Sequence, residues 1–347
     1  MKKIKTALLS YGMSGKVFHA PFLNAHPGFE LIGAWERSTK NIQQNYHSTE
    51  SFNSFEALLQ SDTELIVVNT PVATHFEYTK AALNAGKHVL VEKSFTTNAA
   101  EAQELDNLAK SRGLKLCVYQ NRRWDSDFLT VKKVLDEGVL GDIVEAEIRF
   151  DRYNPVLSPK AHKEVAEPGA GILWDLGSHV IDQALQLFGF PEAVYGDLRK
   201  TRNNSLIDDD FSIVLYYPDK RIKLHAGFFV REAVPSYAIH GKNGSFLKER
   251  GDVQEDQLKV GVKPEDTAYG IEPEDKQGLL HTGIDGEAIR KKIMTERGNY
   301  MTLFNALHDA LVNDKPVPVP ANEGIMTMKI IDAVQYSSSE RKIIDVR

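Results

Sequence analysis

The sequence predicts an α/β protein with two domains, a doubly wound parallel sheet followed by an α+β domain built on antiparallel strands. Residues 3–120 alternate short apolar runs with helical segments, which is typical of a parallel sheet with right-handed crossovers. After Trp124 the apolar runs are joined by short loops at residues 218–220 and 242–244, which favour hairpins. A chain of 347 residues, 42% of them hydrophobic, can form a core in each domain. We therefore expect a first domain at residues 1–122 and a second at residues 123–347.

The first domain should contain five strands, at residues 4–9, 30–35, 65–69, 88–91 and 115–119. Helices are expected at residues 76–85 and 98–111, ending at Gly86 and Gly113, because glycine readily adopts the left-handed conformation that closes a helix. In such sheets ligands bind beyond the carboxyl ends of the strands. The residues that follow each strand are therefore the first candidates for a functional site.

The second domain begins with a helix expected at residues 128–137. Strand-like runs follow at residues 143–150, 193–201, 211–217, 221–229, 237–240 and 245–248. Residues 251–281 are charged, rich in Gly and Pro and without clear periodicity, so we expect a long surface excursion, either a lid or an oligomer arm. Two amphipathic helices are expected at residues 300–312 and 324–338.

Charge and cysteine content narrow the class of partner. A net charge of −6, with no Lys/Arg-rich run, disfavours nucleic acid and anionic membranes, so a small molecule is the expected partner. Cys117 is the single cysteine, which excludes an intrachain disulfide and a multi-thiolate zinc site and fits a reducing cytoplasm. No stretch approaches the roughly 20 apolar residues of a membrane span, and no metal-ligand motif is present. We expect a cytoplasmic protein without a metal site.

A glycine turn follows the first strand directly. Gly12 and Gly15 lie three residues apart, where a chain turning into a helix can present backbone N–H groups of Met13 and Ser14 to a diphosphate. Gly12 and Gly15 match the second and third glycines of the fingerprint G-x-G-x-x-G, whereas Ser10 stands at the place of the first glycine. The alternative is an ordinary strand-turn-helix. If the fingerprint holds, Gly12, Met13, Ser14 and Gly15 bind a dinucleotide.

The end of the second strand bears on the choice of cofactor. Glu36 lies 24 residues after Gly12, near the position where an acid, about 20 residues on, accepts the adenosine ribose hydroxyls. Arg37 and Ser38 follow, and a guanidinium and a hydroxyl suit the 2'-phosphate of NADP instead. A solvated loop is the alternative for these residues. NAD and NADP both stay open.

Two groups of residues could carry proton chemistry. Lys93 follows the fourth strand and could act as an acid or polarise a substrate oxygen, or it could be an exposed loop lysine. Asp175 and His179 are four apart, so on a helix they share one face and could converge on a substrate hydroxyl. Alternatively, Asp175 caps the helix and His179 is half-buried. Asp182, at the next turn, could hold the helix end in place.

Five ordered motifs together resemble one known family. They are YGMSGKVFHAPFL from residue 11, TPVATH at 70–75, AGKHVLVEKS at 85–94, NRRWDSDF at 121–128 and GAGILWDLGSHVIDQ at 169–183. The sequence resembles the Gfo/Idh/MocA oxidoreductases over essentially its whole length, in particular their branch of NADP-dependent scyllo-inositol dehydrogenases. The resemblance implies an N-terminal Rossmann domain and a C-terminal domain with a large open antiparallel sheet. That sheet often forms the subunit interface, so a homodimer or homotetramer is expected.

The resemblance also assigns roles by position. It implies hydride transfer between a nicotinamide cofactor, with NADP preferred over NAD, and a cyclic polyol or sugar. Lys93 matches the lysine of the family's E-K-P motif, and Asp175 and His179 match its D-x-x-x-H pair, with His179 exchanging the hydroxyl proton. The remaining assigned positions are Thr70, Pro71, His75, Glu92, Asn121 and Arg122 for the cofactor, and Arg123, Trp124 and Tyr153, beside Lys93, Asp175 and His179, for the substrate.

Three positions depart from the family pattern. Ser10 replaces a glycine, Ser94 replaces the proline after Lys93, and Glu36 stands where this branch commonly has a small hydroxyl residue. Two alternative functions also remain. One is a nucleotide-sensing regulator that binds a protein partner without catalysis, and the other is a reductase of a different carbonyl substrate.

Overall fold

The computed structural model describes residues 2–36, 40–158, 164–284 and 287–347. The chain forms two compact units. The first comprises Met1–Asn121, Gln254–Tyr269 and Asn299–Ile325, and the second comprises Arg122–Val253, Gly270–Gly298 and Met326–Arg347. Two later segments, Gln254–Tyr269 and Asn299–Ile325, therefore pack with the first unit. A single division of the chain after residue 122 does not describe this arrangement.

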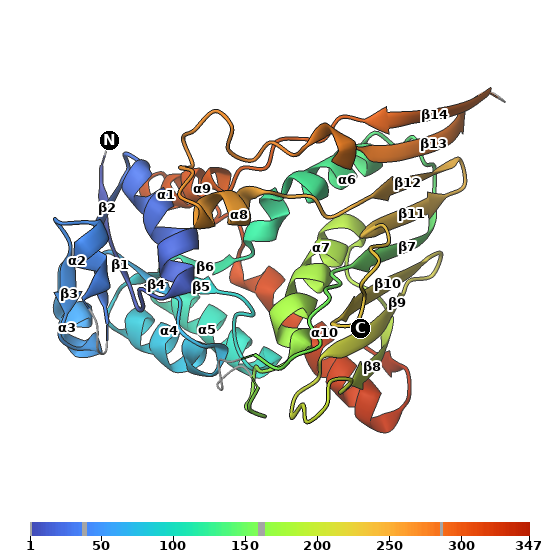
Figure 1. The fold of residues 1–347 in the computed structure, drawn as a ribbon. Coiled ribbons are helices and arrows are strands. Elements are labelled where there is room, and N and C mark those ends of the chain that lie inside the picture. Colours follow the sequence, from blue (N-terminus) through green and yellow to red (C-terminus); the bar gives the residue numbers. More distant parts are fainter. Residues whose placement is uncertain (1, 37–39, 159–163, 285–286) are drawn as a thin grey trace. The chain divides into compact units, whose positions relative to one another are not determined.

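The first unit is built on a parallel sheet with the strand order β3-β2-β1-β4-β5-β6 in the described residues (Figure 1). The strands are β1 Ile4–Leu8, β2 Phe29–Trp35, β3 Glu50–Phe52, β4 Leu65–Val68, β5 His88–Glu92 and β6 Leu116–Tyr119. All five expected strands are confirmed, whereas β3 was missed because three residues are too few to show a pattern. The order reverses between β1 and β4, and ligands bind at such switch points.

The helices of this unit have local causes in the sequence. They are α1 Ala20–Ala25, α2 Asn41–Asn45, α3 Phe55–Gln60, α4 His75–Asn84, α5 Ala99–Ser111, α8 Gln254–Lys259 and α9 Met301–Val312. The Asn98 side chain caps α5 by accepting a hydrogen bond from the Glu101 N–H (2.9 Å). Gly86 and Gly113 adopt positive φ angles of 76° and 63° after α4 and α5, which confirms both expected helix ends.

The second unit carries a large sheet of the order β14-β13-β12-β11-β7-β10-β9-β8-β15 among the described residues. Its strands are β7 Ile143–Arg149, β8 Ala193–Arg199, β9 Asp210–Tyr216, β10 Arg221–Gly227, β11 Tyr237–Gly241, β12 Gly244–Lys248, β13 Gly278–Ile284, β14 Glu287–Ile293 and β15 Ile344–Asp345. Both expected hairpins are confirmed, since β9 pairs with β10 and β11 with β12 in antiparallel fashion. The sheet is mixed, however, because β7 and β10 pair in parallel.

Among the described residues, three α-helices belong wholly or partly to the second unit. They are α6 Ser126–Asp136, α7 Ser178–Phe188 and α10 Ala321–Glu340, of which α10 begins in the first unit. In helix α7 eight of the eleven residues are buried, and the helix lies against β7 and β10. No helix in the described part of the chain has the length and apolar character that crossing a membrane requires.

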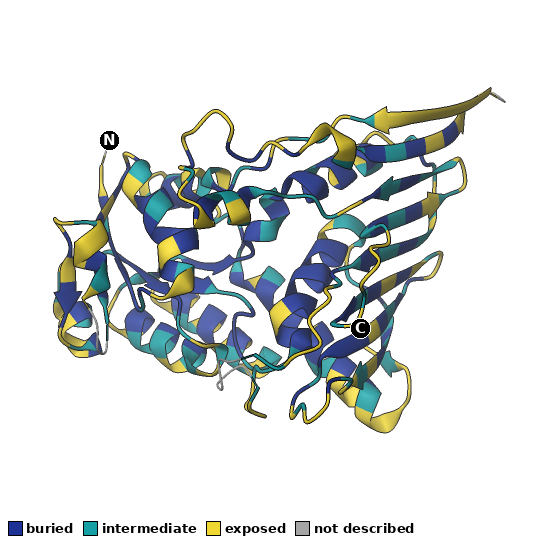
Figure 2. Cartoon of the chain, in the orientation of Figure 1, coloured by how far each residue is buried: buried dark blue, intermediate teal, exposed yellow. Residues whose placement is uncertain are grey.

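The long surface excursion expected at residues 251–281 contains regular elements and buried contacts that the sequence pattern did not indicate. It contains α8, a 3₁₀ turn at Glu274–Lys276 and the first residues of β13. The Lys248 ammonium and the Glu272 carboxylate form a fully buried ion pair (2.6 Å), and Ser126 donates to the same carboxylate (2.6 Å). Strand β14 was missed because its side chains are exposed on both faces, so no alternation marks it (Figure 2).

Acidification below about pH 6.5 is expected to lower the free energy of unfolding. The Nδ1 atom of His26 accepts a hydrogen bond from the Gly28 N–H (2.9 Å), and burial together with nearby His308 lowers the pKa of His26. As the pH falls, the unfolded chain therefore takes up this proton before the folded chain does. The contribution of His26 to the free energy of unfolding is complete above the pKa that His26 has in the unfolded chain, and it is lost progressively below that pKa.

Urea unfolding between about pH 7.5 and 5 measures this dependence. In His26→Asn the amide oxygen can still accept from Gly28 while no proton is bound, so the loss of stability on acidification should be smaller. His47 is exposed, and His47→Asn should retain the full dependence. An unchanged pH dependence in His26→Asn would contradict the assignment.

Candidate functional site

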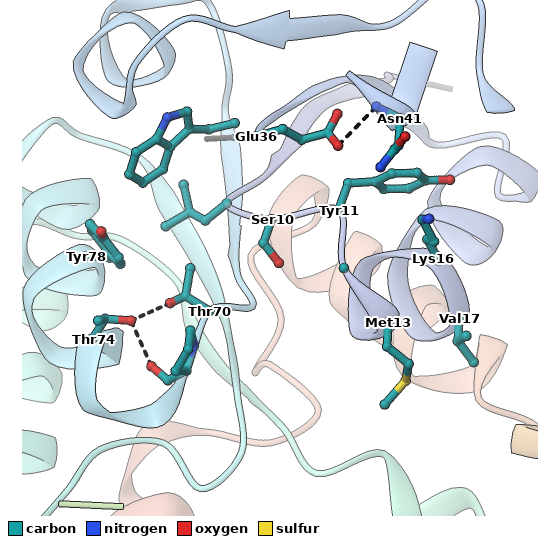
Figure 3. A pocket seen from close by; sticks show the side chains of 14 residues that line it. Ser10, Tyr11, Met13, Lys16, Val17, Glu36, Asn41, Thr70, Thr74 and Tyr78 are labelled. Atoms are coloured by element: carbon teal, nitrogen blue, oxygen red, sulfur yellow. Dashed lines mark hydrogen bonds between the residues drawn. The ribbon is translucent and has the colours of Figure 1, made fainter. Parts of the chain in front are cut away.

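A cavity of about 680 Å³ opens in the first unit at the switch point of its sheet. Its lining comes from the segments after β1, β2 and β4, as Figure 3 shows. The lining residues are Leu9, Ser10, Tyr11, Gly12, Met13, Lys16, Val17, Trp35, Glu36, Asn41, Thr70, Pro71, Thr74 and Tyr78. The cavity therefore lies where a doubly wound sheet binds a dinucleotide.

The two glycines of the turn serve different purposes. A Cβ atom at Gly12 would meet no neighbour closer than the Ser10 Oγ at 3.9 Å, so the missing side chain leaves open space at the cavity. A Cβ atom at Gly15 would lie 2.6 Å from the Ser10 carbonyl oxygen, so this glycine permits close backbone packing. Gly12 thus leaves space at the cavity, and Gly15 permits the close backbone approach of the turn.

Serine is accommodated at the first position of the fingerprint through Asn69. The Ser10 N–H donates to the Asn69 side-chain oxygen (2.9 Å), the Asn69 amide donates to the Ser10 carbonyl oxygen (2.9 Å), and the Ser10 hydroxyl donates to the Asn69 carbonyl oxygen (3.0 Å). Three hydrogen bonds to one residue after β4 hold the turn in place. The sequence alone did not indicate this partner.

Glu36 caps helix α2. Its carboxylate accepts hydrogen bonds from the N–H groups of Asn41 and Ile42 (3.1 Å each) and from the Ser51 hydroxyl (3.3 Å). The side chain also lines the cavity, as expected for the end of β2. Arg37 and Ser38, the other two candidates here, lie outside the described residues.

Glu92, at the end of β5, is bound to the glycine-turn helix. Its carboxylate accepts from the Ser14 hydroxyl and contacts the His19 Nε2 atom at 2.8 Å. Burial acts to raise the pKa of Glu92, but the hydrogen bonds from His19 and Ser14 outweigh it and lower that pKa below its usual value. A charged Glu92 therefore anchors the first turns of the helix, including the π-helical turn Gly15–His19.

His75 connects two loops at the same edge of the sheet. Its Nε2 atom lies 2.8 Å from the Thr70 carbonyl oxygen and its Nδ1 atom 3.1 Å from the Phe95 carbonyl oxygen. Burial lowers the pKa of His75, so the ring is neutral and donates one of these hydrogen bonds at a time. The side chain is fully buried and acts on the cavity by fixing the Thr70 loop.

In the second unit, Asp175 and His179 lie on one continuous helical segment. A π-helical turn, Leu173–Gly177, leads into α7, and such turns are rare and often mark functional sites. The Asp208 carboxylate caps the start of this segment by accepting a hydrogen bond from the Leu173 N–H (2.9 Å). Asp175 is exposed and His179 is 4% exposed, so the carboxylate is accessible while the imidazole is held by its surroundings.

The NRRW segment is bound to the same helix one turn further on. The Arg123 guanidinium forms two hydrogen bonds to the Asp182 carboxylate (2.8 and 2.6 Å), and both side chains are buried. Gln183 donates to the Arg122 carbonyl oxygen (3.2 Å). Asp182 therefore holds this segment rather than only the helix end, and Arg123 is engaged in an ion pair instead of being presented to a ligand.

Five of the expected cofactor residues line the cavity, namely Gly12, Met13, Glu36, Thr70 and Pro71. The others within the described chain do not line it: Ser14, Gly15, His75 and Glu92 support it through the contacts above, and Asn121 and Arg122 lie on the 3₁₀ turn after β6. The other lining residues, to which the sequence assigned no cofactor role, are Leu9, Ser10, Tyr11, Lys16, Val17, Trp35, Asn41, Thr74 and Tyr78. Leu9, Ser10, Tyr11 and Trp35 lie at or directly after a strand end, which is the available signal, whereas the other residues lie six to ten residues beyond one.

The remaining candidates lie in both units. Lys93 follows β5 in the first unit, and the Lys93–Ser94 peptide bond is cis. Asp175, His179, Trp124 and Tyr153 belong to the second unit, where exposed Tyr153 accepts a hydrogen bond from Arg231.

A parallel sheet with a glycine turn beside a cavity at its switch point defines a dinucleotide-binding protein. The chain belongs to the Gfo/Idh/MocA family of oxidoreductases. The family domain described as "Oxidoreductase family, NAD-binding Rossmann fold" matches residues 4–120, and the one described as "Oxidoreductase family, C-terminal alpha/beta domain" matches residues 132–346. The expected fold class and family are confirmed, and the chain is an NAD(P)-dependent oxidoreductase.

Several relatives are similar over nearly their full length. The scyllo-inositol 2-dehydrogenase (NADP(+)) IolW of Bacillus subtilis is 37% identical over 98% of this chain and 95% of its own. The oxidoreductase YdgJ of Escherichia coli is 38% identical over 97% of each chain. The structure of the oxidoreductase yvaA from Bacillus subtilis, at 36% identity, superposes with a TM-score of 0.97 and covers 100% of this chain and 99% of that one.

The two glycines provide a matched pair of variants. Gly15→Ala is expected to lower the free energy of unfolding by about 1–3 kcal/mol, because its Cβ would overlap the Ser10 carbonyl oxygen. Gly12→Ala should fold normally but bind nucleotide more weakly, because its Cβ would occupy open space at the cavity. Urea unfolding and nucleotide titration separate the two effects. Equal stability in both variants, or unweakened binding in Gly12→Ala, would contradict the assigned roles.

Proposed function

We propose that this protein transfers a hydride reversibly between nicotinamide and a secondary alcohol carbon of a cyclic polyol or sugar. The observation that carries the proposal is the 37% identity, over 98% of the chain, to a relative named scyllo-inositol 2-dehydrogenase (NADP(+)). NADP is the expected cofactor, with NAD as the alternative. A homodimer or homotetramer stays a prediction that size-exclusion chromatography with light scattering can test.

The cavity in the first unit fits the cofactor on two counts. The open space at Gly12 allows a diphosphate to approach the backbone, and the cavity adjoins the ends of β1, β2 and β4. Thr70 and Pro71 contribute a second wall, which the Thr74 hydroxyl stiffens by donating to the Thr70 hydroxyl (2.8 Å). The bound nicotinamide supplies or accepts the hydride.

The chain itself supplies the proton chemistry. His179 accepts the substrate hydroxyl proton on its imidazole, whose Nδ1 atom is buried. Asp175, one turn earlier, balances the charge of the resulting imidazolium. Lys93 polarises the substrate oxygen, and Trp124 and Tyr153 contact the polyol. Arg123, as the ion-pair partner of Asp182, holds the segment that carries Trp124 to α7.

A substrate panel tests the proposal. Absorbance of reduced nicotinamide is followed with NADP and NAD against inositols, aldoses and ketoses, and oxidation of at least one cyclic polyol or sugar is expected. Tight nucleotide binding without turnover across the panel would instead support a nucleotide-sensing regulator. Reduction confined to other carbonyl compounds would support the reductase alternative.

A further inference from the structure

Lys16 and Glu36 are the two charged residues among the described residues that line the cavity. Lys16 lies on the π-helical turn after the glycines, is exposed, and places its ammonium 5.5 Å from the centre of the Tyr11 ring. No ion pair of Lys16 is present in the described part of the chain. A cation supported by a ring and reachable from solvent can bind an anionic ligand.

Glu36 is poorly suited to the role that the sequence first indicated for it. Its carboxylate already accepts three hydrogen bonds, from Asn41, Ile42 and Ser51. A carboxylate offers about four lone-pair positions. About one position therefore remains, so Glu36 is committed mainly to α2 and β3 and has little capacity left for the ribose 2'-hydroxyl, through which an acid at this place selects NAD.

Hydrogen-bond donors gather on the same wall of the cavity. Figure 3 shows Lys16, Tyr11 and Asn41 on one side of the cavity, beside Glu36. Burial, with Tyr46 and Glu36 nearby, raises the pKa of Tyr11, so its phenol stays protonated and can donate. An ammonium, a phenol and an amide provide the donors that a phosphate ester accepts.

We propose that Lys16, with Tyr11 and Asn41, binds the 2'-phosphate of NADP and makes the protein select NADP over NAD. The inference deepens the proposed function by naming the residues that choose its cofactor, and it rests on the proposed use of this cavity for a nicotinamide dinucleotide. Glu36 is then a helix cap at the rim of this subsite rather than the ribose acceptor.

Calorimetric titration of the full-length protein with NADP⁺ and NAD⁺ tests the proposal, because these ligands differ only in the 2'-phosphate. The wild type should bind NADP⁺ more tightly. Lys16→Ala should weaken NADP⁺ binding about ten- to a hundredfold and leave NAD⁺ binding unchanged, as removal of one charged hydrogen-bond partner predicts. Lys16→Arg, which retains the charge, should restore most of the affinity for NADP⁺.

Two further variants complete the design. Lys110 lies on α5, exposed and paired with Asp106, and Lys110→Ala should alter neither dissociation constant. Glu36→Gln removes the negative charge beside the phosphate while keeping an acceptor for α2, so it should tighten NADP⁺ binding without weakening NAD⁺ binding. If Glu36 were the ribose acceptor, the same change would weaken NAD⁺ binding instead.

An equal loss of both ligands in Lys16→Ala would assign the lysine to the diphosphate and overturn the proposal, as would no loss at all. The readout is independent of turnover. Selective loss of NADP⁺ affinity in a protein that oxidises no polyol would support the cofactor subsite while rejecting the proposed substrate class. If the wild type oxidises a polyol but Lys16→Ala binds NADP⁺ as tightly as the wild type, the substrate class is supported and the cofactor subsite is rejected.

Discussion

His179→Ala is expected to lower kcat by about 10²–10⁴, the usual contribution of a positioned proton-transfer group. The proposed step requires an imidazole to accept the hydroxyl proton as the hydride leaves carbon, and alanine cannot do so. Nucleotide affinity should be retained, because the glycine turn and its cavity belong to the first unit whereas His179 belongs to the second. Steady-state kinetics and calorimetric titration measure the two quantities separately.

The matched control is His281, which is exposed on β13 of the same unit, and His281→Ala should retain wild-type kcat. Lys93→Ala should reproduce the loss seen with His179→Ala, again with nucleotide binding intact. Near wild-type turnover in both Lys93→Ala and His179→Ala would reject the mechanism. A loss in His179→Ala that is accompanied by lost nucleotide binding would indicate misfolding instead of removal of a proton acceptor.

Asp182→Ala is expected to lower the free energy of unfolding by about 3–5 kcal/mol, because it leaves the Arg123 guanidinium buried without its carboxylate. The two side chains are 9% and 3% exposed, so water cannot replace the lost partner fully. The double variant Arg123→Met/Asp182→Leu removes both charges and should recover much of the loss. Urea unfolding of the three proteins measures the difference.

An exposed ion pair supplies the contrast. Lys132 and Asp136 pair on the surface of α6 (2.7 Å), and Asp136→Ala should change the free energy of unfolding by no more than about 0.5 kcal/mol. If Asp182→Ala were as mild as Asp136→Ala, the Arg123–Asp182 pair would not be the contact that holds the NRRW segment to α7.

Elements with a local signature could be predicted from the sequence. The run Leu65–Val68 is apolar throughout and forms the fully buried strand β4, and glycines end α4 and α5 where expected. Strands β3 and β14 were missed for different reasons, because β3 has only three residues and β14 has no buried face. Their place in a sheet depends on pairing with a neighbour and not on their own pattern.

Part of the candidate site was also open to sequence reasoning. Gly12, Glu36 and Thr70 line one cavity because the carboxyl ends of parallel strands share one edge of a sheet. The sequence could not predict the role of Glu36, because the hydrogen-bond partners of its carboxylate depend on how α2 and β3 pack beside β2. Whether the Lys16 ammonium can bind an anionic ligand likewise depends on which charged side chains the fold places around it.

By itself the sequence determined the doubly wound sheet, the glycine turn and the family, because apolar periodicity, glycine conformation and motif order are properties of short stretches. Only the tertiary structure decided that Arg123 is paired with Asp182, 59 residues away, that Asn69 secures Ser10, and that Glu36 caps a helix. The physical reason is that a polar side chain acts according to the partners it meets. Those partners come from distant segments whose approach is fixed by burial of the core and not by the residues next to it in the chain.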